Sequence, residues 1–254
     1  MIYLYGLLEP GSADPGAALE GAEGVTGPVA VADLGSALVV HGPSDSHEIL
    51  PRRRHLLAHA RVLEALSGTG ALLPMRFGMV GQDLGELAGI LARQHAEIRE
   101  QFDAVRGCAE YGIRVAFPRP AALSALIATD ADLAAERARI AEGKGARRME
   151  AADFGRRLAD RLDRRRALAQ KAILAQLSDE FAGHVLRAPE EDVQVLALDA
   201  LVPNGHAEEL AARIEAVARG SGFAPDAEPE VRLVGPSPAY SFVRLVLDTD
   251  RRAA

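Results

Sequence analysis

The amino-acid sequence predicts an α+β protein built from two domains. Strand-like and helix-like segments alternate along the 254 residues, and the strands occur singly or in hairpins without a strict βαβ repeat. Each half holds about four apolar strands and two or more amphipathic helices, which is the inventory of a split βαβ sandwich. We therefore expect an N-terminal α+β domain over residues 1–108 and a C-terminal α+β domain over 109–254, with a long helical insertion at about 121–182.

Apolar runs and their breakers predict the elements of the first half. β-Branched, aromatic and aliphatic residues in IYLYGLL predict a strand that ends at Glu-Pro-Gly, and two apolar runs around Asp-Leu-Gly-Ser predict a hairpin. Apolar stripes at helical spacing predict two helices, of which Gly68 ends the first. In order, we expect a strand at 2–8, a loop with one helical turn at 9–27, a hairpin at 28–40, a helix at 51–67, a strand at 72–80 and a helix at 82–106.

The second half is dominated by helical periodicity. Prolines end its first strand, and a Glu-Gly-Lys-Gly sequence separates its two long helices. A Gly-Pro-Ser-Pro sequence near the C-terminus predicts a turn between two strands. In order, we expect a strand at 110–118, helices at 121–142 and 150–182, a strand at 193–203, a helix at 206–219 and two strands within 231–247.

Composition narrows the possible classes of function. Hydrophobic residues make up 48% of the chain and aromatic residues 4%, so aliphatic residues must build most of the core. The net charge of −7 argues against binding to nucleic-acid phosphates. The first residues lack the basic segment of a signal peptide, and no apolar run approaches the ~20 residues that span a bilayer. These features are typical of a soluble cytoplasmic protein.

Two histidines four residues apart, His55 and His59, lie in the predicted helix 51–67. Histidines at this spacing share one helical face and can hold zinc, but the zincin motif also needs a glutamate where Leu56 stands. His59 falls inside the apolar stripe and His55 at its edge. We therefore interpret both as partly buried residues that form hydrogen bonds within the fold. The alternative is a metal-dependent or small-molecule-binding enzyme that uses His55, His59 and Arg76.

Arg76 lies in the apolar segment LLPMRFGMV. Strand alternation would point Met75, Phe77 and Met79 to one face and Arg76 to the other. A guanidinium there could bind an anion or a carboxylate. The structural interpretation, an ion pair with an acid of a neighbouring helix, is favoured.

Other charged or reactive residues carry weaker signals. The single cysteine, Cys108, excludes an intrachain disulfide and a multi-cysteine zinc site, and no adjacent histidine marks it as a nucleophile. A third class of function would be nucleic-acid binding through the arginine-rich helix around 156–171. Acidic residues are interleaved in that helix at pairing distance, so the sequence indicates a solvated face or a protein contact instead.

Several short motifs together resemble the gas vesicle protein family GvpL/GvpF. Members open with a tyrosine-rich strand, continue with an arginine-led helix that has a histidine before V-x-E, then a strand reading LPxRFG-[TM]-V, and end with a G-P-x-P-x-Y-S-F turn. The matching residues are Tyr3, Tyr5 and Gly6; His59, Val62 and Glu64; Pro74, Arg76, Phe77, Gly78 and Val80; and Gly235, Pro236, Pro238, Tyr240, Ser241 and Phe242. In one departure, Ser237 and Ala239 stand where the family often has Trp and Pro.

The resemblance implies a structural or assembly role and no enzymatic one. Gas vesicles are hollow protein shells that provide buoyancy and are built mainly from a small, very hydrophobic protein, and members of this family resemble accessory components. The resemblance implies binding to this shell protein and to other gas vesicle proteins, with no nucleic acid, membrane, metal or cofactor, and a location at the gas vesicle within the cytoplasm. It also implies two α+β domains, the first of them ferredoxin-like.

Pro74 suggests where such binding could occur. A proline within strand 72–80 fits best at an edge strand or a bulge, because it cannot donate a hydrogen bond to a neighbouring strand. An uncovered sheet edge or sheet face would suit an aggregation-prone partner, by strand addition or by hydrophobic contact. The motif residues are therefore expected to serve the fold or an interaction surface.

Overall fold

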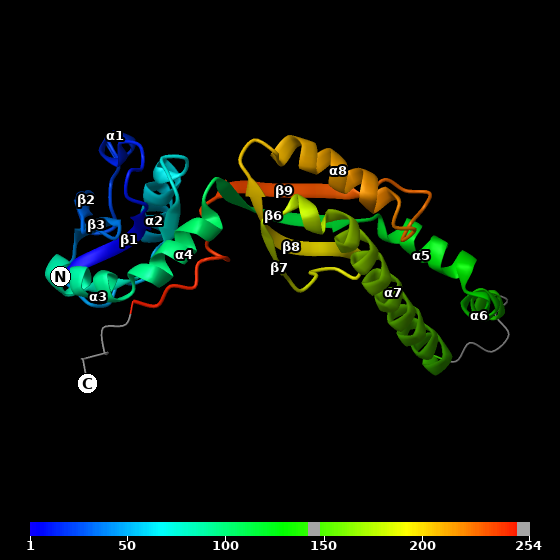
Figure 1. Ribbon diagram of the computed structural model, residues 1–254. Helices are drawn as coiled ribbons and strands as arrows, with labels where there is room; N and C mark the ends of the chain where they lie inside the picture. The colour runs from blue at the N-terminus through cyan, green and yellow to red at the C-terminus, as the bar shows by residue number, and fades with distance from the viewer. Residues whose placement is uncertain (142–147, 248–254) are drawn as a thin grey trace. The chain divides into compact units, whose positions relative to one another are not determined.

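The computed structural model describes residues 1–141 and 148–247 and shows the expected mixture of helices and antiparallel sheets (Figure 1). Contacts divide the chain into two compact units. Unit 1 comprises Met1–Glu110 and the segment that begins at Pro236, and unit 2 comprises Tyr111–Gly235. The α+β class is confirmed, whereas the division into domains at residues 1–108 and 109–254 stays a prediction.

Unit 1 is built on a sheet with the strand order β2-β3-β1-β4, in which β1 is antiparallel to both of its neighbours and β5 also pairs with β1. Its first strand is central, a hairpin lies on one side, and the strand after the next helix lies on the other, which is the split βαβ arrangement. The elements are β1 (Ile2–Leu8), α1 (Pro15–Ala18), β2 (Ala30–Asp33), β3 (Leu38–Pro43), α2 (Arg53–Leu66), β4 (Leu72–Pro74), β5 (Val80–Gly81), α3 (Leu84–Arg93) and α4 (His95–Val105).

The core of unit 1 forms around β1. Its residues from Tyr3 to Leu8 are all buried, so both faces of the strand are covered. Helix α2 packs its apolar stripe of Val62, Leu63 and Leu66 against the face that carries Tyr3 and Tyr5. Helix α4 contacts β4, and α3 contacts β5. The sheet of unit 1 therefore has no open face at β1, and its edge strands are β2 and β4.

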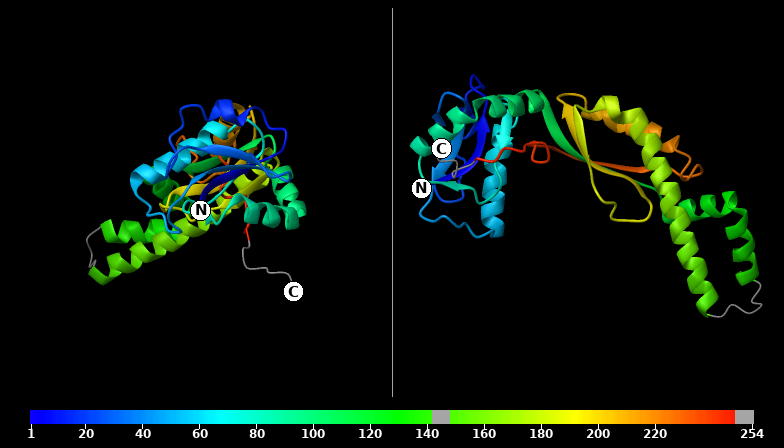
Figure 2. Two further views of the ribbon diagram at one scale, coloured as in Figure 1. Left: turned by 90° about the vertical axis from the view of Figure 1, so that its left-hand side faces the viewer. Right: turned by 60° about the horizontal axis from the view of Figure 1, so that its bottom comes forward.

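Unit 2 repeats the same connectivity with longer helices. Its sheet has the order β7-β8-β6-β9, so again the first strand is central between a hairpin and the last strand. Helices α5 and α6 pack against α7, and α7 packs against α8 and β8 (Figures 1 and 2). The elements are β6 (Cys108–Ala116), α5 (Arg119–Thr129), α6 (Ala131–Ala141), α7 (Arg148–Leu177), a 3-10 turn (Ser178–Glu180), β7 (Gly183–Leu186), β8 (Gln194–Pro203), α8 (Ala207–Arg219) and β9 (Glu230–Ser237).

The structure corrects several expected elements. The predicted strand 72–80 is interrupted by a turn, so only β4 and β5 remain of it. The predicted helix 82–106 is divided at Gln94 into α3 and α4, and the helix predicted at 121–142 is divided at Asp130 into α5 and α6 over its described part. The second long helix ends earlier than expected, and the short strand β7 follows it.

The expected pair of strands within 231–247 is also wrong. A single strand, β9, runs through Gly235 and Pro236 to Ser237, and the following described residues, up to residue 247, form no further strand. In this part of the chain the backbone bonds side chains instead: the N–H groups of Ser241 and Arg244 donate to Glu110 and Gln101.

Candidate functional site

The resemblance motifs meet at a buried histidine in unit 1. His59, only 4% exposed, lies on α2 and contacts β1 and the turn after β4. Its Nε2 lies 3.1 Å from the Met75 carbonyl oxygen, and its Nδ1 lies 2.8 Å from the Tyr3 hydroxyl. A carbonyl oxygen can only accept, so Nε2 carries the proton and Nδ1 accepts from Tyr3 in the neutral ring.

The Tyr3 hydroxyl extends this network to the turn at residues 75–79. It accepts a hydrogen bond from the Gly78 N–H at 3.2 Å while it donates to His59. Gly78 has a φ of 89°, in the left-handed region that glycine adopts without strain. Hydrogen bonds between the backbone and the side chains of Tyr3 and His59 therefore hold this turn against β1, so three of the motif residues act together in this chain.

Aromatic rings complete the cluster. The Tyr5 ring stacks on the His59 ring with centroids 5.6 Å apart, and Phe77 packs edge-on against His59 at 5.8 Å. The Tyr5 hydroxyl accepts from the Val25 N–H at 2.7 Å, which ties down the loop before β2. Offset and edge-on aromatic pairs contribute about 0.5–1.5 kcal/mol each beyond burial. The cluster thus joins β1, α2, the turn 75–79 and the loop 21–25.

Burial sets the protonation of this cluster. Desolvation lowers the pKa of His59, and the hydrogen bond to the Met75 carbonyl opposes this shift in part. Desolvation likewise raises the pKa of Tyr3 and the pKa of Tyr5, so both phenols stay protonated. His59 is therefore neutral near pH 7, with both ring nitrogens engaged.

Stability should consequently depend on pH through His59. Its folded pKa is lower than the ordinary value near 6.5, so the unfolded chain binds more protons and the free energy of unfolding should fall as the pH drops below about 6.5, by up to ~1.4 kcal/mol per pH unit. Burial also lowers the pKa of His41, so this residue contributes to the same loss of stability as the pH falls. The free energy of unfolding, measured by urea unfolding at several pH values between 7.5 and 5.5, should fall less with decreasing pH in His59→Gln than in the wild type. His55→Gln is the control. An unchanged pH dependence in His59→Gln would contradict the view that His59 is buried in its neutral form.

The histidine pair does not converge on a shared position. The Nδ1 of His55 lies 3.0 Å from the Leu50 carbonyl oxygen, and its Nε2 accepts from Arg54 at 3.1 Å. Among the described residues, no group of three or more His, Cys, Asp or Glu side chains is placed to hold a metal ion. Each histidine thus forms hydrogen bonds within the fold, as the structural interpretation predicts, and His59 is the more buried.

The interpretation of Arg76 requires correction. Residues 75–79 form a turn and not a strand, so the expected alternation of Met75, Phe77 and Met79 against Arg76 does not apply. Met75 is buried, whereas Arg76 is exposed and forms no ion pair with the described part of the chain. The expected pairing with an acid of a neighbouring helix is therefore wrong.

The C-terminal motif also packs within unit 1. Glu110, 7% exposed, accepts hydrogen bonds from the Ser241 N–H at 2.8 Å and from the Ser241 hydroxyl at 2.7 Å. Tyr240 lies beside these groups: desolvation, followed by the carboxylates of Glu64 and Glu110, raises the pKa of its hydroxyl to about 12. The motif residue Phe242 donates its backbone N–H to the Ala239 carbonyl oxygen. These bonds and that from the Arg244 N–H to Gln101 hold the C-terminal segment up to residue 244 within unit 1, a role that sequence reasoning missed because Glu110 gives no local signal.

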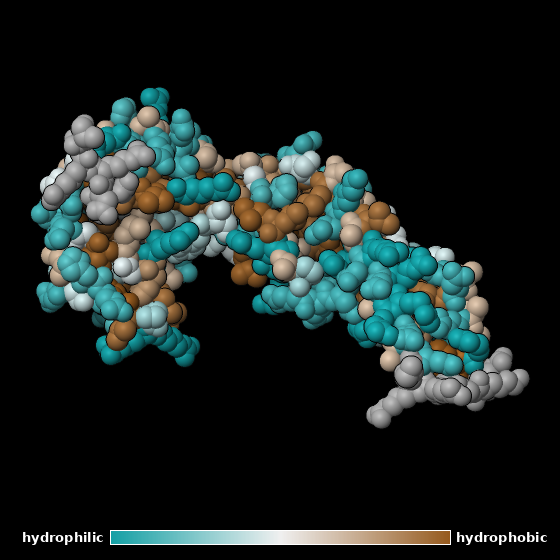
Figure 3. All heavy atoms as spheres, turned by 90° about the horizontal axis from the view of Figure 1, so that it is seen from below, coloured by the Kyte–Doolittle hydropathy of each residue, from teal (hydrophilic) through white to brown (hydrophobic). Residues whose placement is uncertain are grey.

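The arginine-rich helix α7 is largely neutralised within unit 2. Arg156 and Arg166 pair with acids three residues earlier on α7. Arg157 forms an ion pair with Glu136 on α6, and Arg161 forms one with Asp130, which directly precedes α6. Figure 3 shows hydrophilic side chains over this helical region. The interleaved acids act as expected, and these pairs disfavour a nucleic-acid surface here.

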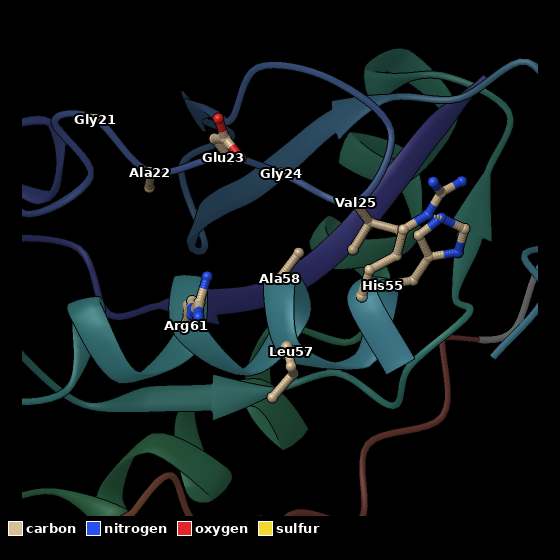
Figure 4. Close-up of a pocket in the computed structure, with 10 residues that line it drawn as sticks. Gly21, Ala22, Glu23, Gly24, Val25, His55, Leu57, Ala58 and Arg61 are labelled. Carbon is tan, nitrogen blue, oxygen red and sulfur yellow. Dashed lines mark hydrogen bonds between the residues drawn. The ribbon is translucent and has the colours of Figure 1, made fainter. Parts of the chain in front are cut away.

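An open groove of about 580 Å³ lies at the surface of unit 1, between the loop 21–25 and helix α2. Figure 4 shows the loop crossing over the helix, with His55 and Arg61 toward opposite ends of the groove and Glu23 on the loop side. Leu57 and Ala58 contribute apolar surface from α2. Sequence reasoning did not identify this groove, because its two walls lie about thirty residues apart in the chain.

Comparison with known proteins places this chain among gas vesicle proteins. The family model described as gas vesicle synthesis protein GvpL/GvpF matches residues 1–244. Gas vesicle protein F of Streptomyces sp. (strain CB03234) is 29% identical over 213 residues, which are 82% of this chain and 84% of that protein. Gas vesicle protein F of Dolichospermum flosaquae is 25% identical over 219 residues, 85% of this chain and 88% of that protein.

Two crystal structures share the fold. That of GvpF from Anabaena sp. PCC7120 superposes with a TM-score of 0.76 at 20% identity, over 96% of this chain and 98% of that chain. That of GvpF from Microcystis aeruginosa gives a TM-score of 0.69 at 23% identity, over 96% of this chain and 99% of that chain. No helix within residues 1–141 and 148–247 is long and apolar enough to cross a membrane.

Proposed function

Because the chain belongs to the gas vesicle synthesis protein GvpL/GvpF family, we propose that it is a non-enzymatic accessory protein of gas vesicles that binds the small hydrophobic shell protein and other gas vesicle proteins. The observation that carries this proposal is the family match over residues 1–244, which includes both units and all of the motif blocks. We place its action at the gas vesicle within the cytoplasm, in shell assembly or as a minor shell component.

The contacts of the motif residues support a role without catalysis. His59 uses both ring nitrogens in bonds to Tyr3 and Met75, and the Glu110 carboxylate accepts two bonds from Ser241. A general base or nucleophile must reach a substrate, whereas these groups are buried and partnered inside the fold. The motifs accordingly maintain a scaffold, and binding falls to the surface around them.

Edge strands are one surface that suits an aggregation-prone shell protein. β9 forms one edge of the sheet of unit 2, and its Val234 is 55% exposed. β7 forms the other edge, where Leu186 is 49% exposed. An extended segment of the shell protein could add to such an edge through backbone hydrogen bonds, with an aliphatic side chain against Val234 or Leu186. Pro74 lies at the end of β4, an edge strand of unit 1, where a proline is tolerated.

The test is co-purification. The tagged chain is co-expressed with the small shell protein, captured on resin, and the eluate is assayed both for the shell protein and for zinc. We expect the shell protein to elute with the chain and zinc to be absent. An unrelated acidic protein of similar size carrying the same tag is the control for non-specific capture of a hydrophobic protein.

Two outcomes would contradict the proposal. In the first, the shell protein is recovered equally with the control, so that its capture reflects hydrophobic adhesion. In the second, the chain elutes alone with stoichiometric zinc, which would favour the metal-dependent alternative at His55 and His59. A Val234→Lys variant that keeps its fold should recover less shell protein if the β9 edge contributes, whereas Leu168→Lys on α7 should not.

A further inference from the structure

The groove beside α2 combines free positive charge with exposed aliphatic surface. Arg54 and Arg61 line it, and neither forms an ion pair with a carboxylate anywhere in residues 1–141 or 148–247. Within the described residues, the Arg54 guanidinium donates to the His55 ring. Arg106, Arg119 and Arg219 pair with carboxylates, whereas Arg76 and Arg164, like the two groove arginines, form no ion pair with the described residues. Unpaired arginines gathered in one place on a protein of net charge −7 indicate a surface complementary to an acidic partner.

The positive charges in the first turn of α2, Arg54 among them, are unfavourable for the helix. Three arginines, Arg52 to Arg54, stand at the start of α2, where the helix dipole disfavours positive charge by about 0.3–1 kcal/mol each. The helix has no acidic residue in its first turn and no side-chain cap to offset them. A carboxylate from a partner would relieve this repulsion, and the free chain contains nothing that does so among its described residues.

Apolar surface lies between the charges. Leu57 is 44% exposed and lines the groove together with Ala58 and Val25. These three side chains give the groove an apolar wall that aliphatic side chains of a partner can contact.

The spacing of the charges matches that of acidic residues on a helical ligand. Arg54 and Arg61 are seven residues apart, which is about 10 Å along a helix. Two carboxylates seven residues apart on a second helix have the same separation. Glu23 on the loop side of the groove would repel acidic groups, so they must face α2.

We propose that this groove binds an acidic, aliphatic helical segment of a partner protein, with carboxylates paired to Arg54 and Arg61 and leucine-type side chains between them against Leu57 and Ala58. The partner is then a protein with acidic amphipathic character, distinct from the edge-strand contact suggested for the shell protein. This inference depends on the proposed accessory role in one respect: both assume that the chain binds other proteins.

The test measures binding of a synthetic peptide to the purified chain. The probe is a fluorescein-labelled helical peptide of two heptads, with leucines along one stripe and two glutamates seven residues apart beside it. Fluorescence anisotropy should show binding that weakens in 0.5 M NaCl, because opposite charges are screened. We expect Arg54→Glu/Arg61→Glu and Leu57→Glu each to weaken binding at least tenfold. Arg164→Glu, at an exposed arginine of α7 without an ion pair in the described structure, should leave binding unchanged.

Exchanging the charges of the peptide and the groove shows whether weaker binding by the double variant results from unfolding. The same peptide with lysine in place of both glutamates should fail to bind the wild type and should bind Arg54→Glu/Arg61→Glu. Equal binding of both peptides to the wild type, or unchanged binding by the double variant, would overturn the proposal. So would a dimer of the chain, measured by sedimentation, that Arg54→Glu/Arg61→Glu abolishes, since a second copy would then occupy the groove. Because the peptide assay contains no shell protein, its failure is separate from failure of co-purification.

Discussion

Replacing His59 by alanine is expected to lower the free energy of unfolding by about 3 kcal/mol. The substitution leaves the Tyr3 hydroxyl and the Met75 carbonyl oxygen without their partner, and it opens a cavity between the rings of Tyr5 and Phe77. An unsatisfied buried polar group costs about 1–3 kcal/mol. Because the surrounding side chains relax in part, the total loss is smaller than the sum of the two polar groups and the cavity. Urea unfolding at pH 7.5 measures this change.

His55 is the matched control for His59. It lies one helical turn earlier on α2 and is only partly buried, and its ring bonds the Leu50 carbonyl oxygen at the surface. His55→Ala should change the free energy of unfolding by less than ~1 kcal/mol. Similar losses in the two variants would refute the view that the network of Tyr3, His59 and Met75 organises unit 1.

Replacing Arg165 by methionine is expected to destabilise unit 2 by about 2 kcal/mol. Its guanidinium donates to the carbonyl oxygens of Phe223 and Gly222 and to the Thr129 hydroxyl, at 2.6–2.9 Å. It therefore joins α7 to the end of α5 and to the loop after α8. Desolvation lowers the pKa of Arg165, which indicates that its charge is partly buried. Methionine keeps much of the aliphatic stem but none of the three bonds.

Arg164 provides the comparison at the neighbouring position. It is exposed on α7, so Arg164→Met should leave the free energy of unfolding within about 0.5 kcal/mol of the wild type. Thermal unfolding monitored by circular dichroism separates the two variants. Equal midpoints for Arg165→Met and the wild type would show that the bonds to residues 129, 222 and 223 add nothing to stability.

Local patterns were sufficient for most of the fold. The strand 2–8, the hairpin at 28–40, the helix 51–67 and the strand 193–203 all carry clear periodicity or clear breakers, and the structure confirms each to within a few residues. The α+β class and the inventory of a split βαβ sandwich follow from the order of these elements along the chain. The burial of His59 follows from its place in the apolar stripe of one helix.

The remaining features depend on contacts between distant residues. LLPMRFGMV has the composition of a strand, but Tyr3 and His59 hold residues 75–79 in a turn from across the sheet and from α2. The sequence after Gly235 has the composition of a hairpin. In the structure, however, Ser241 forms hydrogen bonds to the Glu110 carboxylate and no second strand forms there. The groove at α2 exists because the Val25 N–H bonds Tyr5 and positions the loop 21–25. None of these partners is near in sequence to the segment that it shapes.

The return of the chain from unit 2 to unit 1 determines the order in which the protein can be completed during synthesis. A ribosome releases the residues of unit 2, up to Gly235, before it releases those that bond Glu110 and Gln101. Unit 1 starts first but receives its closing contacts last, whereas unit 2 is an uninterrupted stretch of chain. A nascent chain stopped at residue 235 would thus hold every residue of unit 2 and leave the buried carboxylate of Glu110 without the partner that the finished protein supplies.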